Sequence, residues 1–280
     1  MSSENKRLDK ELSSLIRRRR RIDERIARLL GHELPAHHPL LQQSGGTPRP
    51  EAQLEPAQVT VVGVDGAPGG WAAAELFDRR LVGVRLFRDF RLLLDDYGGR
   101  AKVIAVDMPI GLTDDGDREA DRAARAFVGP KLRSTVFPSP PTWALDAANY
   151  PGARALRPQG AKGVGSQTFA LVKRIKEVAE AVETGAPIFE VHPEVSFRAL
   201  KGAPLEWPKK TSEGREERLE LLESVGFEPP LDPIRGAAVE DVVDACVAAW
   251  SAHRIATKRA SALPAPEKLD FRPQPQLIWF

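Results

Sequence analysis

Two aspartates stand at the ends of apolar, strand-like segments. Asp65 follows Val64 at the end of a run rich in β-branched residues, and Asp107 follows Val106 in the same way. Ligands of open α/β sheets bind at the carboxyl edge of the strands, so neighbouring strands would bring both carboxylates to one edge. Glu190, near the end of a third apolar run, could join them. The sequence therefore predicts an acidic site at the edge of a sheet.

A further group of acids opens the last long helical segment. Asp241 and Asp244 are three residues apart and share a helix face, next to Glu240. An acid in the first turn also caps a helix and interacts favourably with its dipole, so one of these three could be structural.

Carboxylates gathered from separate elements are suited to hard divalent cations. Mg²⁺ and Mn²⁺ prefer oxygen ligands. Two such ions about 4 Å apart can stabilise the attacking and leaving oxygens of a phosphoryl displacement. We therefore expect two Mg²⁺ or Mn²⁺ ions. Without metal the carboxylates repel one another, and at least one pKa rises. The expected ligands are Asp65, Asp107, Glu190, Asp241 and Asp244.

His192 and several basic side chains are candidates for contacts with a substrate. His192 lies between two acids and could orient a water or contact a phosphate, and a histidine hydrogen-bonded at a strand end is the alternative. Arg118, Arg122 and Arg125 recur at intervals of four and three, which predicts one helix face. A phosphate track and solvated surface charge are both open interpretations. The expected substrate-binding residues are Arg118, Arg122, Arg125, Lys173, Lys209, Lys210 and Arg215.

The elements that must position these residues are strands and helices in an α/β arrangement. Three apolar segments joined by short turns predict an antiparallel meander, and two buried strands follow later in the chain. We therefore expect a mixed sheet flanked by helices. The expected strands are 59–64, 71–77, 81–87, 102–106 and 187–191. The expected helices are 89–97, 117–128, 166–183, 213–225 and 238–258, with a long Pro- and Gly-rich loop at 134–165.

Residues 1–32 are expected to form a basic helix of the coiled-coil type. Apolar residues recur there in steps of four and three, although Arg19 interrupts the seam. Residues 1–30 hold ten Lys or Arg against five Asp or Glu. Self-association is the leading interpretation. A helix that packs on its own domain is the alternative, and the basic charge could also hold an anionic polymer.

The rest of the composition bounds the domain and its location. Residues 33–57 are rich in His, Pro, Gly, Gln and Ser and predict a linker, which leaves 58–280 as the globular domain. Cys246 is the one cysteine, so a disulfide framework is excluded and a cytoplasmic location is expected. No segment approaches the roughly 18 uncharged apolar residues of a membrane span. The charged N-terminus lacks the apolar core of a secretion signal.

Four motifs of the chain are Gly63-Val64-Asp65-Gly66, Asp107-Met108-Pro109-Ile110-Gly111-Leu112, Glu190-Val191-His192-Pro193-Glu194 and Asp241-Val242-Val243-Asp244-Ala245. Taken together, they resemble the motifs of one family, known as domain of unknown function 429 and described as predicted nucleases of the RNase H fold. The resemblance covers about 59–259 and leaves out the N-terminal helix and linker.

The resemblance implies an RNase H-like sheet whose strand order is set by the three-strand meander. It also implies that Asp65 is the central metal ligand and that Asp107 shares the site with either Glu190 or Glu194. Asp241 or Asp244 would complete the site. Glu240 stands where we expect an aspartate beside Asp241, so the resemblance leaves open which acid of this helix binds metal.

These observations lead us to expect a divalent-metal-dependent nuclease that cleaves DNA or RNA. A non-catalytic module that binds nucleic acid or protein on the same fold is the first alternative. An ATP-dependent phosphotransferase is the second, because sugar kinases and actin-like ATPases share a related core with an Asp-Gly turn after the first strand. That architecture needs two related halves and a second phosphate loop, and the sequence shows no internal repeat.

Overall fold

The computed structural model describes residues 59–280. The basic coiled-coil helix expected at 1–32, with the self-association proposed for it, and the linker expected at 33–57 lie outside the described residues. Between residues 59 and 280, no helix combines the length and the apolar character needed to cross a membrane.

A five-stranded mixed sheet forms the centre of the described chain, in the order β3-β2-β1-β4-β5. The first three strands form the expected antiparallel meander: β1 (Thr60–Ala67), β2 (Gly70–Phe77) and β3 (Arg80–Phe87). β4 (Val103–Val106) and β5 (Ile188–Glu190) then add in parallel on the other side of β1. The α/β class and the mixed sheet flanked by helices are confirmed.

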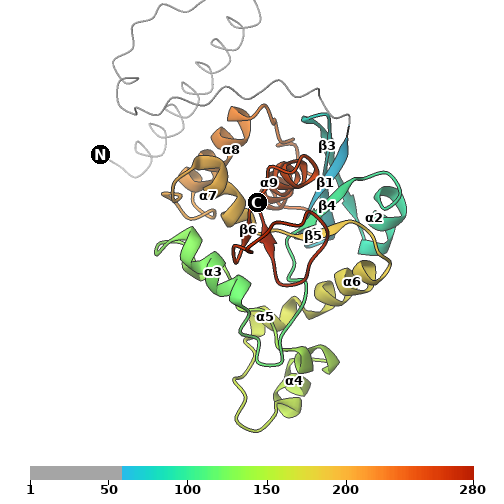
Figure 1. Cartoon of the computed structure of the whole chain (residues 1–280), viewed down its shortest axis with the longest axis vertical. Helices are drawn as coiled ribbons and strands as arrows, with labels where there is room; N and C mark the ends of the chain where they lie inside the picture. The colour runs from blue at the N-terminus through green and yellow to red at the C-terminus, as the bar shows by residue number, and fades with distance from the viewer. Residues whose placement is uncertain (1–58) are drawn as a thin grey trace, which may run out of the picture. The chain divides into compact units, whose positions relative to one another are not determined.

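Helices cover both faces of this sheet (Figure 1). On one face lie α2 (Phe90–Tyr97) and α6 (Val172–Glu183). The other face is covered by α9 (Val239–Ala256), which contacts β1, β2 and β4. Around α9 lie α3 (Glu119–Val128), α7 (Pro193–Lys201) and α8 (Ser212–Ser224). The arrangement is therefore helix, sheet, helix, with the long helix α9 against the middle of the sheet.

Side chains alternate between the two faces along β1. Val61 belongs to the core beneath α9, and Gly63 faces α9 directly. Val62 and Val64 pack instead with α2 and α6. Because successive side chains of a strand point to opposite faces, Asp65 lies on the α9 face.

Gly63 allows α9 to approach the backbone of β1 unusually closely. A Cβ atom at this position would lie 1.9 Å from Ala249 N, 2.2 Å from Ala245 O and 2.5 Å from Ala248 C. These are backbone atoms, which cannot move aside as a flexible side chain can. The small residues of α9 and the missing side chain of Gly63 therefore set how deeply the helix sits on the sheet.

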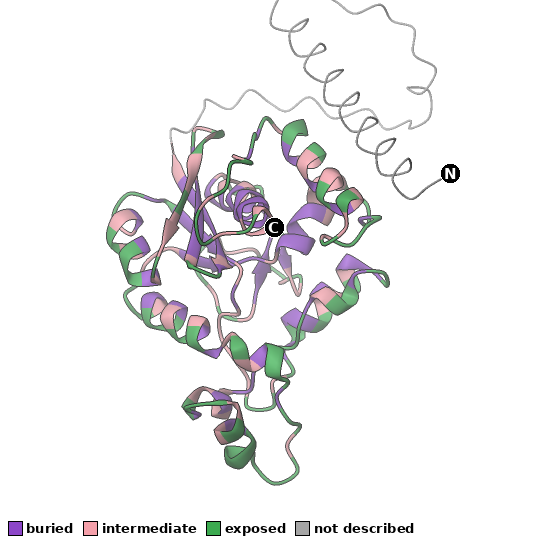
Figure 2. Cartoon of the chain, turned by 180° about the vertical axis from the view of Figure 1, so that it is seen from behind, coloured by how far each residue is buried: buried purple, intermediate pink, exposed green. Residues whose placement is uncertain are grey.

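A lobe extends from the carboxyl end of the sheet, where the sequence predicted a long loop. Instead of a loop, 134–165 contains the short helix α4 (Tyr150–Leu156), which begins after a cap from Asn149 Oδ1 to Gly152 N. The expected helix 166–183 is divided at Leu171 into α5 (Ser166–Ala170) and α6. Buried residues gather in the strands and in α9, whereas the lobe that carries α4 is largely exposed (Figure 2). The lobe has its own small cluster of buried alanine and valine residues.

The C-terminal segment lies beside β5, at the edge of the sheet opposite β3. β6 (Ala262–Leu263) and β7 (Ile278–Trp279) form a short antiparallel pair, and Trp279 bridges to Val191 just after β5. Gln276 N donates to Ile110 O over 2.8 Å. The last residues therefore hold the loop that follows Asp107.

We predict that Gly63→Ala destabilises the protein severely. The new methyl group meets backbone atoms of α9, so the helix must lift from β1. Overpacking of this kind costs about 1–3 kcal/mol or more, and we expect the upper part of this range. Gly83→Ala on β3 is the matched control, because no atom lies within 4 Å of its added Cβ. Urea unfolding measures both variants, and equal stability would contradict the close approach of α9.

Candidate functional site

Three of the predicted aspartates come together on the α9 face of the sheet. Asp65 stands on β1, Asp107 directly follows β4, and Asp244 lies in the second turn of α9. Asp65 and Asp244 are buried, with 8% and 2% of their surfaces exposed, and Asp107 is partly exposed. We call Asp65, Asp107 and Asp244 the aspartate cluster.

Lys209 supplies a positive charge to the aspartate cluster. Its Nζ donates to Asp244 Oδ2 over 2.6 Å, and 36% of the lysine side chain is exposed. Burial lowers the pKa of Lys209, but the charges of Asp244, Asp65 and Asp107 outweigh this effect, so the pKa is raised. The residue therefore stays protonated and forms part of the site rather than of the free surface.

The carboxylates of the cluster are electrostatically strained. Burial raises the pKa of Asp65 well above its usual value, and the neighbouring charges of Asp107 and Asp244 raise it further. The pKa of Asp107 is also raised, chiefly by burial and then by Asp244, while His192 and Lys209 act in the opposite direction. This is the behaviour of carboxylates that are buried close to like charges without a sufficient counter-charge.

Asp65 and Asp107 are the residues of the cluster that fit a divalent cation. Among the described residues, no N–H group and no cation forms a hydrogen bond or ion pair with either carboxylate, and the two carboxyl groups lie within hydrogen-bonding reach of each other. Nor does any set of three or more His, Cys, Asp and Glu side chains between residues 59 and 280 form a ready-made metal cage. Mg²⁺ commonly binds through one or two carboxylates, completed by waters and substrate phosphates. The two free carboxylates suit this mode of binding.

Glu190 does not join the aspartate cluster. Glu190 lies in register with Val64 and Val106, whose side chains pack against α2 and α6. Its side chain therefore points to the same face of the sheet, opposite the face that carries the aspartate cluster. There it accepts hydrogen bonds from Arg118 Nη2 at 2.5 Å and Ile110 N at 2.6 Å. Burial raises its pKa to about 7, against the opposing effect of Arg118. Glu190 is therefore held in an ion pair of its own.

Glu194 lies beside the cluster, but both of its oxygens are occupied. Arg218 Nη2 lies 2.7 Å from Oε1 and 2.6 Å from Oε2, and both side chains are almost completely buried. The pKa of Glu194 is raised, because burial and the nearby charge of Asp244 outweigh the opposing effect of Arg218. The pair fixes α7 (which carries Glu194) against α8 (which carries Arg218).

His192 and Asp241 both act at helix starts. His192 Nδ1 accepts from Glu194 N over 3.2 Å as the cap of α7, which matches the alternative of a hydrogen-bonded histidine at a strand end. Asp241 Oδ2 accepts from Ala238 N over 2.8 Å and so caps α9. Asp244, not Asp241, is the acid of this helix that lies in the cluster.

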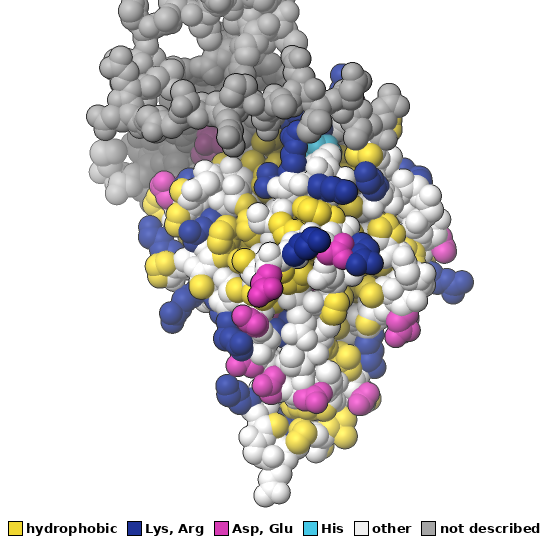
Figure 3. Space-filling view, in the orientation of Figure 1, with side chains coloured by type: hydrophobic (Ala, Val, Ile, Leu, Met, Phe, Trp, Pro, Cys, Tyr) yellow, Lys and Arg dark blue, Asp and Glu magenta, His cyan; other side chains and the backbone are white. Residues whose placement is uncertain are grey.

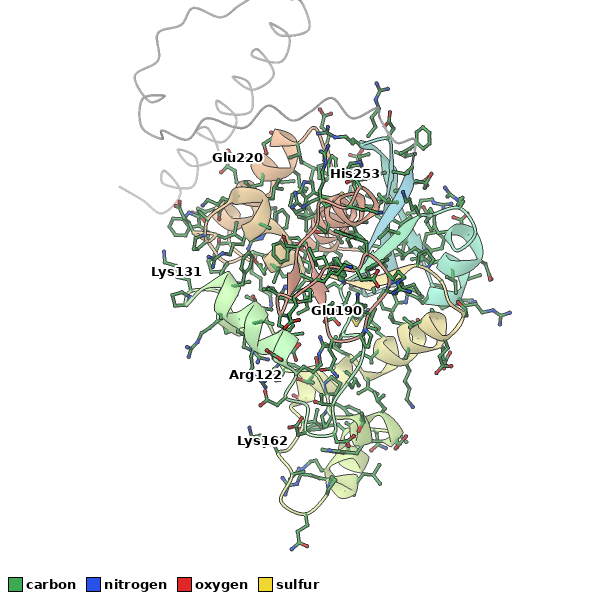
Figure 4. All side chains as sticks on the ribbon, viewed as in Figure 1. Arg122, Lys131, Lys162, Glu190, Glu220 and His253 are labelled. Atoms are coloured by element: carbon green, nitrogen blue, oxygen red, sulfur yellow. The ribbon has the colours of Figure 1, made fainter. Side chains whose placement is uncertain are left out.

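The three arginines expected on one helix face are not brought together. Arg118 is fully buried against Glu190, and Arg125 Nε donates to Val136 O. Arg122 is exposed and pairs with Asp117, and Figure 4 shows it on α3, away from the central Glu190. Arg118 is the extended cap residue just before α3, so its side chain does not follow the helix face that carries Arg122 and turns into the core instead.

The other expected substrate-binding residues remain at the surface. Lys173 and Lys210 are exposed, and exposed Arg215 pairs with Glu240 beside the start of α9. Figure 3 shows Lys and Arg interspersed with acidic and apolar side chains on the viewed face, without one continuous basic track.

Two surface hollows lie away from the aspartate cluster. One of about 470 Å³ is lined by residues that include Arg125 and Phe137, and one of about 630 Å³ by residues that include Trp143 and Arg154. Neither hollow includes a carboxylate of the cluster. Asp107 and Lys209 are the parts of the site that reach the surface, since both are partly exposed whereas Asp65 and Asp244 are buried.

Two residues that matter for the site were missed by sequence reasoning. Gly63 sets the distance between β1 and α9, and its only sequence signal is a glycine inside a strand rich in β-branched residues. Arg218 stands in a helix that is charged all round, so nothing in the pattern separates it from surface arginines. Arg218 also donates to Trp207 O over 3.2 Å, which connects it to the loop that carries Lys209.

We predict that Asp65→Asn makes the metal-free protein more stable at neutral pH. The folded state binds the proton of Asp65 more tightly than the unfolded chain does. The stability of the wild type therefore falls as the pH rises from the usual aspartate pKa of 3.8 through the raised folded pKa. The variant lacks this ionisation, so its advantage in melting temperature should be present at about pH 7.5 and shrink towards about pH 4.

Calorimetry in chelator across this pH range measures the effect. Asp95→Asn, at an exposed position of α2, controls for the loss of one negative charge. An Asp65→Asn variant that melts below the wild type at neutral pH would show that the Asp65 carboxylate stabilises the fold.

We predict that Arg218→Met costs about 3–5 kcal/mol, because it leaves the buried Glu194 carboxylate without its partner. Arg215→Met on the same helix removes only an exposed ion pair and should cost at most about 1 kcal/mol. Denaturant unfolding of the two variants tests the difference. The double variant Arg218→Met with Glu194→Gln should recover part of the loss, since no buried charge then remains. Similar losses in the two single variants would refute the structural role of the buried pair.

Comparison with known proteins shows where the chain belongs. No curated protein and no solved structure matches it significantly. The family model described as "Protein of unknown function (DUF429)" matches residues 63–269, which include all three aspartates of the cluster and Lys209. This match covers well over half of the chain, and the chain therefore belongs to the DUF429 family.

Proposed function

We propose that this protein is a divalent-metal-dependent nuclease that cleaves phosphodiester bonds in DNA or RNA on an RNase H-like fold. The observation that carries the proposal is the aspartate cluster. Three carboxylates from two parallel strands and one helix are gathered although burial and mutual repulsion raise the pKa of Asp65 and Asp107. Strongly perturbed groups of this kind concentrate at functional sites.

The order of the strands supports the RNase H-like part of the proposal. A three-strand antiparallel meander comes first, and two parallel strands then extend the sheet from β1 through crossovers. The leading meander is the part of this order that the family resemblance implies. The carboxyl ends of β1 and β4, where ligands of such sheets bind, carry Asp65 and Asp107.

In this proposal, separate residues would bind the metal ion and the substrate. Asp65 and Asp107 would hold Mg²⁺ or Mn²⁺ with their unpaired carboxylates. Such an ion, when bound, activates water as a nucleophile and neutralises charge on a phosphate. Lys209, partly exposed at the mouth of the site, would attract the substrate phosphate, and burial of the aspartates strengthens all these interactions. Lys210 and Arg215 lie on the adjoining surface and would bind the substrate backbone.

Two observations favour a second candidate, a module that binds nucleic acid without cleaving it. Lys209 already neutralises Asp244, and no three-ligand metal cage is present among residues 59–280. A protein that had lost its metal would have this arrangement. The two candidates differ in whether turnover depends on a metal and on Asp65.

We predict that cleavage requires metal and both unpaired aspartates. Labelled single-stranded, duplex, hybrid and branched nucleic acids should be cut with Mg²⁺ or Mn²⁺ but not with chelator. Asp65→Asn and Asp107→Asn should each lower the rate at least about 100-fold, because even supporting residues of metal sites commonly contribute 10- to 100-fold. Asp95→Asn, an exposed change of the same type, should cleave like the wild type.

Binding measured on the same panel separates the two candidates. Tight binding by the wild type and by Asp65→Asn, without cleavage of any substrate in any metal, would exclude the nuclease and leave the binding module. Melting curves of each variant establish that a loss of cleavage does not come from a loss of folding.

A further inference from the structure

The loop before α8 fixes Lys209 in place. Thr211 Oγ1 donates to Pro208 O over 2.8 Å, and a Cβ at Gly214 would lie only 2.0 Å from Pro208 O. The buried Arg218 holds the same loop at Trp207 O. The ammonium group of Lys209 therefore enters the site from a closely packed backbone and is a built part of it.

The partners of the three aspartates differ. Asp244 is almost completely buried, and its Oδ2 lies 2.6 Å from Lys209 Nζ. Asp65 and Asp107 have no cation or N–H partner among the described residues. The charge of Asp244 is thus already balanced within the chain, while those of Asp65 and Asp107 are not.

The charges of the site then set how many ions it can hold. Three carboxylates and one ammonium group leave two net negative charges, which a single divalent cation balances. A second divalent ion would have to share Asp244 with the ammonium group, and like charges this close repel strongly when they are removed from water. Of the other acids nearby, Glu194 has both oxygens bound to Arg218, and Asp241 is engaged as the cap of α9 by the N–H of Ala238.

We propose that Lys209 supplies the positive charge that a second metal ion would otherwise supply, so that the site takes one divalent cation, bound by Asp65 and Asp107. This inference rests on the proposed metal-dependent function and replaces the two ions expected from the sequence. Lys209 thereby determines the number of metal ions in the site.

The test is the number of Mn²⁺ ions bound to the full chain, measured by isothermal titration and by electron paramagnetic resonance with Mn²⁺ alone. The wild type should bind one ion. Lys209→Met frees Asp244 and should bind two, with the spectral broadening of two neighbouring Mn²⁺ ions. The adjacent, exposed Lys210→Met is the matched control and should bind one. Lys209→Met with Asp244→Asn removes both partners and should also return to one ion.

The outcomes separate this inference from the proposed function. Two ions in the wild type, or one ion in a folded Lys209→Met variant, would overturn the role of Lys209 and leave the nuclease proposal standing. A second ion in the double variant would also overturn it, because Asp244 would then not be the group that Lys209 neutralises. No Mn²⁺ bound by the wild type would overturn the metal dependence itself, and this inference with it. The wild-type stoichiometry remains decisive if Lys209→Met does not fold.

Discussion

The contact between the backbones of β1 and α9 at Gly63 is the constraint on which the rest of the structure depends. A Cβ atom added to Gly63 would lie only 1.9 Å from Ala249 N. This approach seats the helix on the middle of the sheet and fixes the height of Asp244 above Asp65. A helix held one side chain further away would still cover the core, but it would no longer bring its aspartate to the strand ends.

The buried acids around this contact fall into two kinds. Glu190 and Glu194 each have a buried arginine partner, and these pairs connect strands and helices in fixed geometry. Asp65 and Asp107 have no such partner, and their charges are tolerated at a cost to stability. Acids with dedicated partners hold the framework, whereas unpartnered acids keep their oxygens available for a ligand. The alternation of side chains along β5 is enough to place Glu190 on the face of the sheet opposite the cluster.

Much of this arrangement could be predicted from the sequence, because periodicity reports which elements form. The meander, β4, β5 and the long C-terminal helix were all expected, and so was the meeting of Asp65 with Asp107. The register of β5 could not be read, because a shift of one residue turns Glu190 to the other face without changing the pattern. The pairing of Arg218 with Glu194 was also invisible, since side chains distant in the sequence leave no local signal. The short helix α4 depends on a single cap at Asn149, which periodicity cannot show.

The distance in sequence between Gly63 and Ala249 has a consequence for the order of folding. The meander can form from neighbouring segments, but the packing of α9 on β1 requires closure of a loop that spans most of the described chain. Contacts of such high sequence separation form slowly, because the entropy of closure is lost before the contacts are gained. The aspartate cluster, which needs β1, β4 and α9 together, is therefore complete only at the end of folding. Partly folded chains that already contain most of the sheet would lack the site, and the chemistry of the protein would be confined to chains that have reached the native state.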